Sequence, residues 1–205
     1  MKMDMLLPIL LIVAAFWLGA CPFSLWIGRW VLDKDIRDYG DGNPGAANVF
    51  RAGSIKWGFL SVFLDIAKGT PFVALAHLFF GFSEAVIFLV GLSAILGHAF
   101  TPILGFKGGK AIAITFGVFL AIPLPHVFII FLALMAIGFL LLECDSWRVI
   151  FSAVGALSYV VVAGRGLWEV LFMLGVLIIL VVKHFEGLRA IPKRKAKIYI
   201  GFGQK

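Results

Sequence analysis

Long apolar runs, separated by short polar stretches, divide the chain from end to end. A helix of about 20 residues crosses the hydrocarbon core of a bilayer. Lipid offers no partner to an open sheet edge, so each run is expected to be a helix. The pattern predicts an all-α integral membrane protein with about seven transmembrane helices in a single domain, residues 1–205. The predicted spans are 5–27, 57–80, 85–104, 109–123, 126–143, 149–163 and 167–183.

Prolines and run length refine this pattern. Pro123 and Pro125 separate the fourth run from the fifth, which predicts a tight helical hairpin rather than one long helix. The first run, 5–27, is too long for a signal peptide, and no small-residue cleavage site precedes a soluble domain. We therefore expect this run to be a retained span.

Basic residues sort the polar loops into two sets. If seven spans alternate in direction, one side of the membrane carries only Lys2 and Arg165. The other side carries nearly all remaining lysines and arginines, and the positive-inside rule places that side in the cytoplasm. The N-terminus is then outside and the C-terminus cytoplasmic. The basic loops are 28–56, 105–110, 144–148 and the tail from Lys183.

Composition excludes several classes of protein. With 62% hydrophobic residues and a mean hydropathy of +1.06, the chain is not an ordinary soluble domain. Topology and attraction to anionic lipids account for the net charge of +7, including the tail KRKAK at 193–197. Nucleic-acid binding is not expected, because no basic face belongs to a soluble module. Cys21 and Cys144 show no metal-ligand pattern and are expected to be inert packing residues, with no support for a disulfide.

The segment GHAFTPILGFKGGK at 97–110 has the composition of a phosphate-binding loop. Its glycines expose backbone N–H groups and tolerate positive φ, and its lysines add two cations. A helix that begins near the second glycine would also direct its dipole at a bound anion. The spacing is not that of a nucleotide-binding P-loop. An ordinary positive-inside turn would account for the lysines but not for both glycines. The candidate residues are His98, Lys107, Gly108, Gly109 and Lys110.

A second polar loop, GDGNPGAANVFR at 40–51, is rich in hydrogen-bond donors. Arg51 can bind a phosphate or carboxylate with two parallel hydrogen bonds. The amides of Asn43 and Asn48 can orient a substrate that carries hydroxyl groups. A plain interhelical turn with a snorkelling arginine is an equally good interpretation of this loop alone.

Other ionisable residues lie near the ends or inside the spans. His184 ends the last span, and a lone histidine there is more often interfacial than catalytic. Asp65 and Lys68 share one face of the second span. Ionisable side chains inside a membrane span are energetically unfavourable, and they usually face the interior of the helix bundle. We expect these two residues to form a structural ion pair below the site, because each neutralises the other.

Several catalytic motifs are absent from the sequence. No histidine is followed by aspartate at the spacing HxxxxD, and neither GxSxG nor HExxH occurs. If the protein is an enzyme, we expect it to act through positioning and charge stabilisation rather than through a covalent intermediate. No metal or cofactor is expected.

These segments resemble motifs of a known family. GDGNPGAANVFR is similar to the GSGNPGATNVLR signature of the bacterial acyl-phosphate:glycerol-3-phosphate acyltransferases of the PlsY type. GHAFTPILGFKGGKAIA resembles the family's GHxxPxxxxFKGGKGVA segment. Residues 65–69 resemble its DxxKG element, and His184 with Glu186 resembles the start of its HxENIxRL motif. The likeness covers essentially the whole chain.

The resemblance implies a reaction and a place for it. An acyl chain would pass from acyl phosphate to the 1-hydroxyl of glycerol 3-phosphate, giving lysophosphatidic acid, at the cytoplasmic face of a bacterial inner membrane. We expect the protein to be a monomer. The catalytic residues implied are Lys110, His184 and Arg51, and the substrate-binding residues are Asp41, Gly42, Asn43, Gly45, Asn48, His98, Lys107, Gly108, Gly109 and Ser146.

The sequence departs from the family's pattern at several of these positions. Asp41 stands where the family has serine, and its carboxylate would repel a phosphate unless Arg51 or a lysine neutralised it. Ala111 replaces a glycine, and Gly187 replaces an asparagine. Two alternatives therefore stay open. One is a paralogue with a different polyol or phosphate acceptor. The other is a non-enzymatic binder or transporter of an anionic lipid or metabolite, which is disfavoured because transporters tend to have broken helices and internal repeats.

Overall fold

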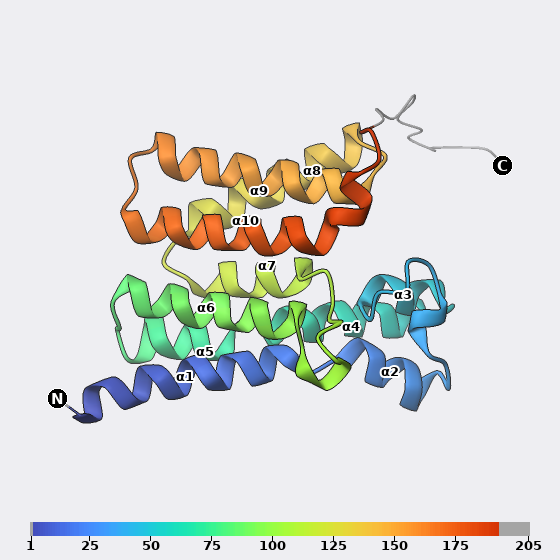
Figure 1. The fold of residues 1–205 in the computed structure, drawn as a ribbon, viewed down its shortest axis with the longest axis horizontal. Coiled ribbons are helices and arrows are strands. Elements are labelled where there is room, and N and C mark those ends of the chain that lie inside the picture. Colours follow the sequence, from blue (N-terminus) through green and yellow to red (C-terminus); the bar gives the residue numbers. More distant parts are fainter. Residues whose placement is uncertain (1, 193–205) are drawn as a thin grey trace.

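The described part of the chain is helical throughout, as predicted (Figure 1). The computed structural model describes residues 2–192, with side chains from Leu6 onward. Five helical segments are long and apolar enough to cross a membrane: Leu6–Val31, Ile55–Phe79, Glu84–Leu104, Asp145–Val162 and Leu167–Leu188. Two shorter apolar helices, Ile112–Ala121 and Pro125–Leu141, coincide with the predicted hairpin at the fourth and fifth runs.

The elements follow one another along the chain with short connections. The first half contains α1 (Lys2–Ala20), α2 (Phe23–Val31), η1 (Ile36–Asp38), α3 (Ala46–Arg51), α4 (Ile55–Ala67), α5 (Pro71–Ala74) and the π-helix η2 (Leu75–Phe79). The second half contains α6 (Glu84–Ala99), η3 (Pro102–Leu104), α7 (Ile112–Ala121), α8 (Pro125–Leu141), α9 (Asp145–Val162) and α10 (Leu167–Leu188).

The long helices form two groups that α7 joins. Helices α8, α9 and α10 pack side by side in one group, and α1, α5 and α6 pack in the other. Helix α10 contacts α6 across the boundary, and α7 packs against α4, α6 and α8. A core of large side chains, including Phe88, Phe119, Phe131 and Phe172, fills the space between the groups.

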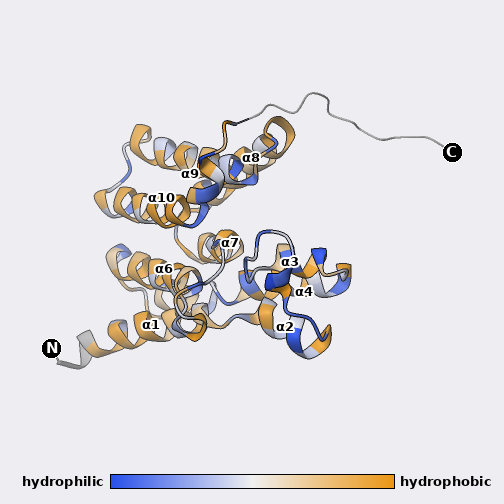
Figure 2. Ribbon diagram, turned by 45° about the vertical axis from the view of Figure 1, so that its right-hand side comes forward, coloured by the Kyte–Doolittle hydropathy of each residue, from blue (hydrophilic) through white to orange (hydrophobic). Residues whose placement is uncertain are grey.

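Polar residues concentrate at one end of the molecule. The short helices α2 and α3 lie at that end, next to the start of α9 and the end of α10 (Figure 1). Figure 2 shows hydrophilic residues gathered there, while the bodies of the long helices are mostly hydrophobic. The loops predicted to share one side of the membrane therefore meet in space.

The first two predicted spans are not continuous helices, which corrects the sequence prediction. Helix α1 ends before Cys21 and Pro22, and α2 starts at Phe23. Helix α4 ends at Ala67, and a new helix starts at Pro71. Proline has no N–H to donate and its ring clashes with the preceding turn, so a helix tends to end before it.

Side chains from other helices satisfy carbonyl groups freed by these breaks. The Lys68 ammonium donates to the Cys21 carbonyl at 2.7 Å, and the Thr101 hydroxyl donates to the Ala20 carbonyl at 2.7 Å. At the second break, the Thr70 hydroxyl donates to the Gly117 carbonyl inside α7 at 3.0 Å, which joins the break to that helix. Unpaired carbonyls in an apolar interior are expensive, so these bonds are what allows the chain to bend there.

A buried polar network of Ser24, Asp65, Lys68 and His98 lies beside the first break. The predicted ion pair is confirmed, with Lys68 Nζ 2.8 Å from Asp65 Oδ1 and both side chains almost fully buried. Ser24 donates to Asp65 Oδ2 at 3.0 Å, and His98 Nδ1 lies 3.8 Å from Asp65 Oδ1. Its hydrogen bond and ion pair join α2 to α4, and His98 of α6 packs beside them with Nδ1 unpaired among the described residues.

Close backbone contact joins α4 to α7. A Cβ atom on Gly117 would lie 1.9 Å from the Ile66 carbonyl oxygen, so no side chain fits at this position. Lipid tails are as apolar as helix side chains, so the hydrophobic effect does not drive helices together inside a bilayer. Small residues at helix crossings let the two backbones approach closely, and this increases their van der Waals contact.

Three of the helix boundaries that differ from the prediction affect the candidate site. Helix α7 begins at Ile112 rather than Gly109, so the glycine pair precedes the helix. Helix α9 begins at Asp145 and α10 continues to Leu188. Ser146 and His184 therefore lie on helices rather than in loops or at a span's exit. Cys21 and Cys144 are both free thiols, and the tail at 193–197 lies outside the described residues.

Replacement of Lys68 with methionine is expected to destabilise the protein strongly. Lys68→Met leaves Asp65 charged and buried without its cation, and it leaves the Cys21 carbonyl unpaired. Breaking a buried ion pair from one side costs about 3–5 kcal/mol. Unfolding in mixed detergent micelles would measure the loss. The double variant Asp65→Asn/Lys68→Met should recover part of it, and the exposed control Lys56→Met should leave stability unchanged. Equal stability of Lys68→Met and the parent would contradict a structural role for the pair.

Candidate active site

Two clefts meet at the polar end of the molecule. The first has a volume of about 430 Å³ and runs between α4, α7, α8 and α9, and the second, of about 680 Å³, opens between the polar loops and α10. Both are lined by four of the predicted site residues, Asp41, Asn43, Lys110 and His184. The sequence-predicted residues are therefore brought together from segments far apart in the chain.

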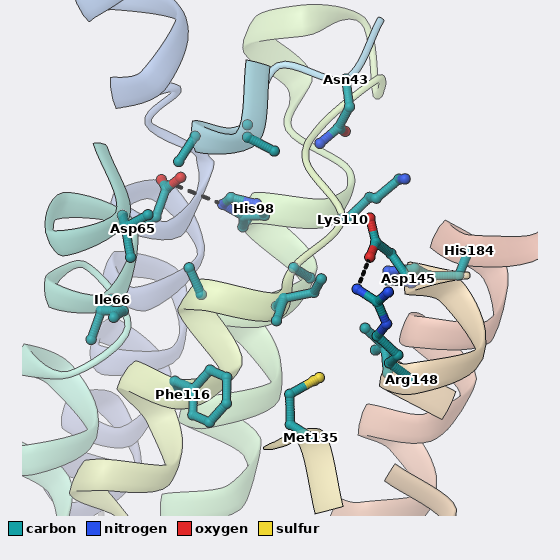
Figure 3. A pocket seen from close by; sticks show the side chains of 18 of the residues that line it. Asn43, Asp65, Ile66, His98, Lys110, Phe116, Met135, Asp145, Arg148 and His184 are labelled. Carbon is teal, nitrogen blue, oxygen red and sulfur yellow. Dashed lines mark hydrogen bonds and ion pairs between the residues drawn. The ribbon is translucent and has the colours of Figure 1, made fainter. Parts of the chain in front are cut away.

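The first cleft has charged groups at one end and apolar walls at the other. Figure 3 shows the apolar side chains of Phe116 and Met135 on the side of the cleft away from Lys110, with Arg148 beside Met135. Phe139, Val62 and Ile112 also line this cleft. A cleft of this kind can hold a molecule with an anionic head and a hydrocarbon tail.

Asp41 lies at the centre of the charged groups. Its Oδ2 is 2.6 Å from Lys110 Nζ, and its Oδ1 is 3.7 Å from the Arg51 guanidinium. Oδ1 also accepts hydrogen bonds from Asn48 Nδ2 at 3.1 Å and from the backbone N–H of Asn43 at 3.2 Å. Both cations expected to neutralise this carboxylate therefore do so.

The pKa of the Asp41 carboxyl lies below its ordinary value. Partial burial raises this pKa, but the hydrogen bond and charge of Lys110 and the hydrogen bonds from Asn43 and Asn48 lower it by more. Asp41 is therefore a carboxylate at neutral pH.

The loop at 40–51 is more than an interhelical turn. Asn48 and Arg51 lie on the short helix α3, and Gly45 precedes its first residue. Asn48 is fully buried, donates to the Asn43 carbonyl at 2.9 Å, and accepts from Arg51 Nη1 at 2.7 Å. These bonds hold the loop around the cleft and aim the guanidinium at it. Gly42 adopts a positive φ of 71° at the loop's turn and lines the second cleft.

The two glycines of the lysine loop, residues 107–110, allow close packing and do not adopt positive φ. A Cβ on Gly108 would lie 2.1 Å from the His98 carbonyl oxygen, and one on Gly109 would lie 2.1 Å from His98 Nε2. The N–H of Gly109 donates to the His98 carbonyl at 3.1 Å and is not available to an anion. The expectation of a cradle of backbone N–H groups is therefore wrong at Gly109, and side chains supply the charge.

Positive φ falls on neighbours of the glycine pair. Gly105, Phe106 and Ala111 have φ of 58°, 65° and 63°. Lys107 is exposed beside the second cleft, and Lys183 Nζ donates to the Gly108 carbonyl at 2.9 Å. Lys183 thus fixes the lysine loop to α10.

His184 lines both clefts, and its two ring nitrogens have different surroundings. Its Nδ1 lies 2.8 Å from the Leu180 carbonyl oxygen, which can only accept, so Nδ1 carries the proton. Nε2 then has a lone pair, and it is buried with no hydrogen-bond partner among the described residues. An unpaired acceptor of this kind can take a proton or hydrogen bond from a bound hydroxyl group.

Ser146 and His98 lie at different depths. Ser146, in the first turn of α9, lines the second cleft and is almost fully buried. A Cβ on Gly187 would lie 2.1 Å from its hydroxyl, so the missing side chain at Gly187 makes room for Ser146. His98 lies beneath the lysine loop and connects it to the buried polar network, which makes it a support of the loop as well as a residue lining the first cleft.

The sequence analysis missed one charged pair of the site. Arg148 and Asp145 form an ion pair within the first turns of α9 and line the first cleft (Figure 3). The Arg148 guanidinium also lies 4.9 Å from the centre of the Phe139 ring. Arg148 was counted only as a topology signal, and its spacing of three residues from Asp145 was the available clue to the pair. Within residues 2–192, no group of three or more His, Cys, Asp or Glu side chains is arranged to hold a metal ion.

Comparison with known proteins places the chain among membrane acyltransferases. The sequence profile of the family "Glycerol-3-phosphate acyltransferase" matches residues 9–193. The chain belongs to the glycerol-3-phosphate acyltransferase family. Its relatives include the glycerol-3-phosphate acyltransferase of Lactococcus lactis subsp. lactis, which is 33% identical over 97% of this chain and 96% of its own. The enzyme of the same name from Listeria monocytogenes strain HCC23 is 37% identical over 76% of this chain and 77% of its own.

Solved structures of this acyltransferase family share the fold. The crystal structure of PlsY (YgiH), an integral membrane glycerol 3-phosphate acyltransferase in its glycerol 3-phosphate form, matches with a TM-score of 0.80 and 30% identity. The match covers 89% of this chain and 90% of that one. The lysophosphatidic acid form of PlsY matches with a TM-score of 0.77 over the same shares. The chain is therefore an integral membrane protein of this family.

Restoring glycine at position 111 is expected to stabilise the protein. Ala111 has a φ of 63° at the start of α7, and a non-glycine residue in the left-handed region is strained by about 1–3 kcal/mol. Ala111→Gly relieves this strain, and the flexibility of glycine in the unfolded chain offsets about 0.5–1 kcal/mol of the gain. The midpoint of thermal unfolding in detergent should rise. The control Ala113→Gly, inside α7, should lower it, and a lowered midpoint for Ala111→Gly would contradict the assignment of strain.

Proposed function

We propose that the protein transfers an acyl chain from acyl phosphate to the 1-hydroxyl of glycerol 3-phosphate and so makes lysophosphatidic acid for phospholipid synthesis. One observation supports this proposal most. The second, polar cleft meets the first cleft, which has apolar walls, at Asp41, Lys110 and His184. Both substrates carry phosphate, and the donor also carries a hydrocarbon chain. Family membership adds the acyltransferase activity, and the cleft's apolar walls favour a donor with a long chain.

The donor fits the first cleft. Its acyl chain would lie against Phe116, Met135 and Phe139, where water is excluded. Its phosphate would lie near Lys107 and Lys110, whose charges stabilise the negative charge that develops as phosphate leaves. The loop's packing on His98 and its bond to Lys183 hold these cations in place before the substrate arrives.

The acceptor fits the polar loop. Arg51, oriented by Asn48, would bind the phosphate of glycerol 3-phosphate, and Asn43 would orient its hydroxyl groups. Ser146 and Gly187 border the same cleft and would contact the glycerol portion. The two substrates then meet between Lys110 and His184.

The transfer needs one proton to leave the acceptor hydroxyl. The unpaired Nε2 of His184 would accept a hydrogen bond or the proton from this hydroxyl as its oxygen attacks the acyl carbonyl carbon. The bond between the carbonyl carbon and the phosphate oxygen then breaks, and inorganic phosphate departs with that electron pair. Lys110 would stabilise the leaving phosphate. The products are lysophosphatidic acid and inorganic phosphate.

The location follows from the charge pattern. We place the site at the cytoplasmic face of a bacterial inner membrane, with the N-terminus outside, because the basic loops surround the clefts. The acting species is proposed to be a monomer.

A different acceptor is the second candidate function. Asp41 neutralises part of the positive charge that would bind an acceptor phosphate. This feature favours a less highly charged polyol. The helix breaks at Pro22 and Pro71 remove one argument against a transporter, but family membership and the unpaired His184 favour an enzyme.

The deciding experiment measures phosphate release from palmitoyl phosphate by purified protein in lipid, with and without glycerol 3-phosphate. Release that requires glycerol 3-phosphate and yields lysophosphatidic acid would support the main proposal. Release with another polyol or phosphate ester would support the second candidate. No release with any acceptor would overturn both.

Loss of Lys110 is expected to abolish turnover while the fold persists. Lys110→Ala removes a cation that is one-third exposed and whose bond is to Asp41, so core packing is untouched. Removal of one group that stabilises developing charge lowers kcat by about 10²–10³-fold. The phosphate-release assay and thermal unfolding would measure the two effects. The surface variant Lys56→Ala should behave like the parent, and normal turnover in Lys110→Ala would refute the assigned role.

A further inference from the structure

One carboxylate occupies the place where a phosphate is expected to bind. Four groups that donate to anions converge on Asp41: the Lys110 ammonium at 2.6 Å, the Arg51 guanidinium at 3.7 Å, the Asn48 amide at 3.1 Å and the Asn43 N–H at 3.2 Å. A phosphate oxygen would accept from the same groups. The site is thus already satisfied by a side chain of the protein itself.

The groups around Asp41 that come from Lys110, Arg51, Asn48 and Asn43 form an anion-binding cradle. The charge of this cradle does not suit a carboxylate and a phosphate together. Arg51 and Lys110 supply two positive charges, and Asp41 cancels one of them. A phosphate dianion would be matched by both cations only when the carboxylate is elsewhere. If both anions shared the cradle, their repulsion would oppose binding in a partly buried site.

The backbone around Asp41 provides freedom to move. Gly40 and Gly42 flank it, and both have positive φ, of 60° and 71°. Glycine populates several backbone regions at little energetic expense, so a residue between two glycines can change direction without strain. The Asp41 side chain is 39% exposed and borders both clefts, so open space is available to it.

We propose that Asp41 is a displaceable internal anion that determines how tightly the enzyme binds the phosphate group of a substrate. In the resting site it holds Lys110 and Arg51 in position, and an incoming phosphate takes its place while the carboxylate turns toward the open cleft. The identity of the substrate rests on the proposed function, but competition between Asp41 and a phosphate group does not.

Inorganic phosphate tests the competition directly. Calorimetric titration of the full chain in detergent, at constant ionic strength, would compare the parent with Asp41→Asn, which keeps the shape and removes the charge. If the Asp41 carboxylate has left the cradle in about a tenth of the resting molecules, the apparent Kd for phosphate is about tenfold lower in Asp41→Asn than in the parent. Asp41→Ser should show the same gain. The control Asp38→Asn, an exposed carboxylate at the end of η1 that lines neither cleft, should bind like the parent.

Steady-state kinetics identify which substrate's phosphate displaces Asp41. A lower KM for glycerol 3-phosphate alone in Asp41→Asn assigns the cradle to the acceptor, and a lower KM for palmitoyl phosphate alone assigns it to the donor. Either result supports displacement. A higher KM for the acceptor would overturn the proposal, because Asp41 would then bind a substrate hydroxyl group.

Two further outcomes would also overturn the proposal. One is an unchanged Kd for phosphate in both Asp41 variants. The other is weaker phosphate binding together with a lower unfolding midpoint, which would make Asp41 a brace of the loop. Absence of acyl transfer with every acceptor would refute the proposed function, but the phosphate titration would still report on Asp41.

Discussion

Backbone N–H and C=O groups that lie away from water need hydrogen-bond partners, and this requirement determines where the helices of this protein can break. Two of its predicted spans break at proline, and each break frees carbonyls that lipid cannot hydrate. Lys68 and Thr101 donate to the carbonyls at the end of α1, and Lys68 is itself held by Asp65. Charged side chains are tolerated at this depth because Asp65 and Lys68 pair with each other, Lys68 is also bonded to the end of α1, and Asp65 accepts from Ser24.

The same network reaches the candidate active site. His98 lies 3.8 Å from Asp65 on one side and packs against Gly109 on the other, so the lysine loop rests on the network. Lys183 fixes the loop from the opposite side through the Gly108 carbonyl. The cations of the site are therefore supported by buried bonds rather than by a flexible turn, which suits catalysis by preorganised charge.

Much of this protein was predictable because the bilayer leaves few choices. Hydropathy predicted the helical class and the approximate positions of the long helices, and basic residues predicted which loops gather at one end. The Asp65–Lys68 pair followed from helical spacing and the expense of an unpaired charge. Motif resemblance identified the family. Helix boundaries were less predictable, since α9 and α10 extend past the apolar runs through polar residues that face the site.

The sequence by itself determined the membrane environment, the helical class and the residue types of the phosphate site, because these depend on composition and local spacing. Only the tertiary structure decided how those residues are used. Gly108 and Gly109 serve packing against His98, Arg148 turns into a cleft, and Asp41 occupies the cradle between Lys110 and Arg51. These relations join residues far apart in the chain, and their distances are set by helix packing that no local pattern specifies.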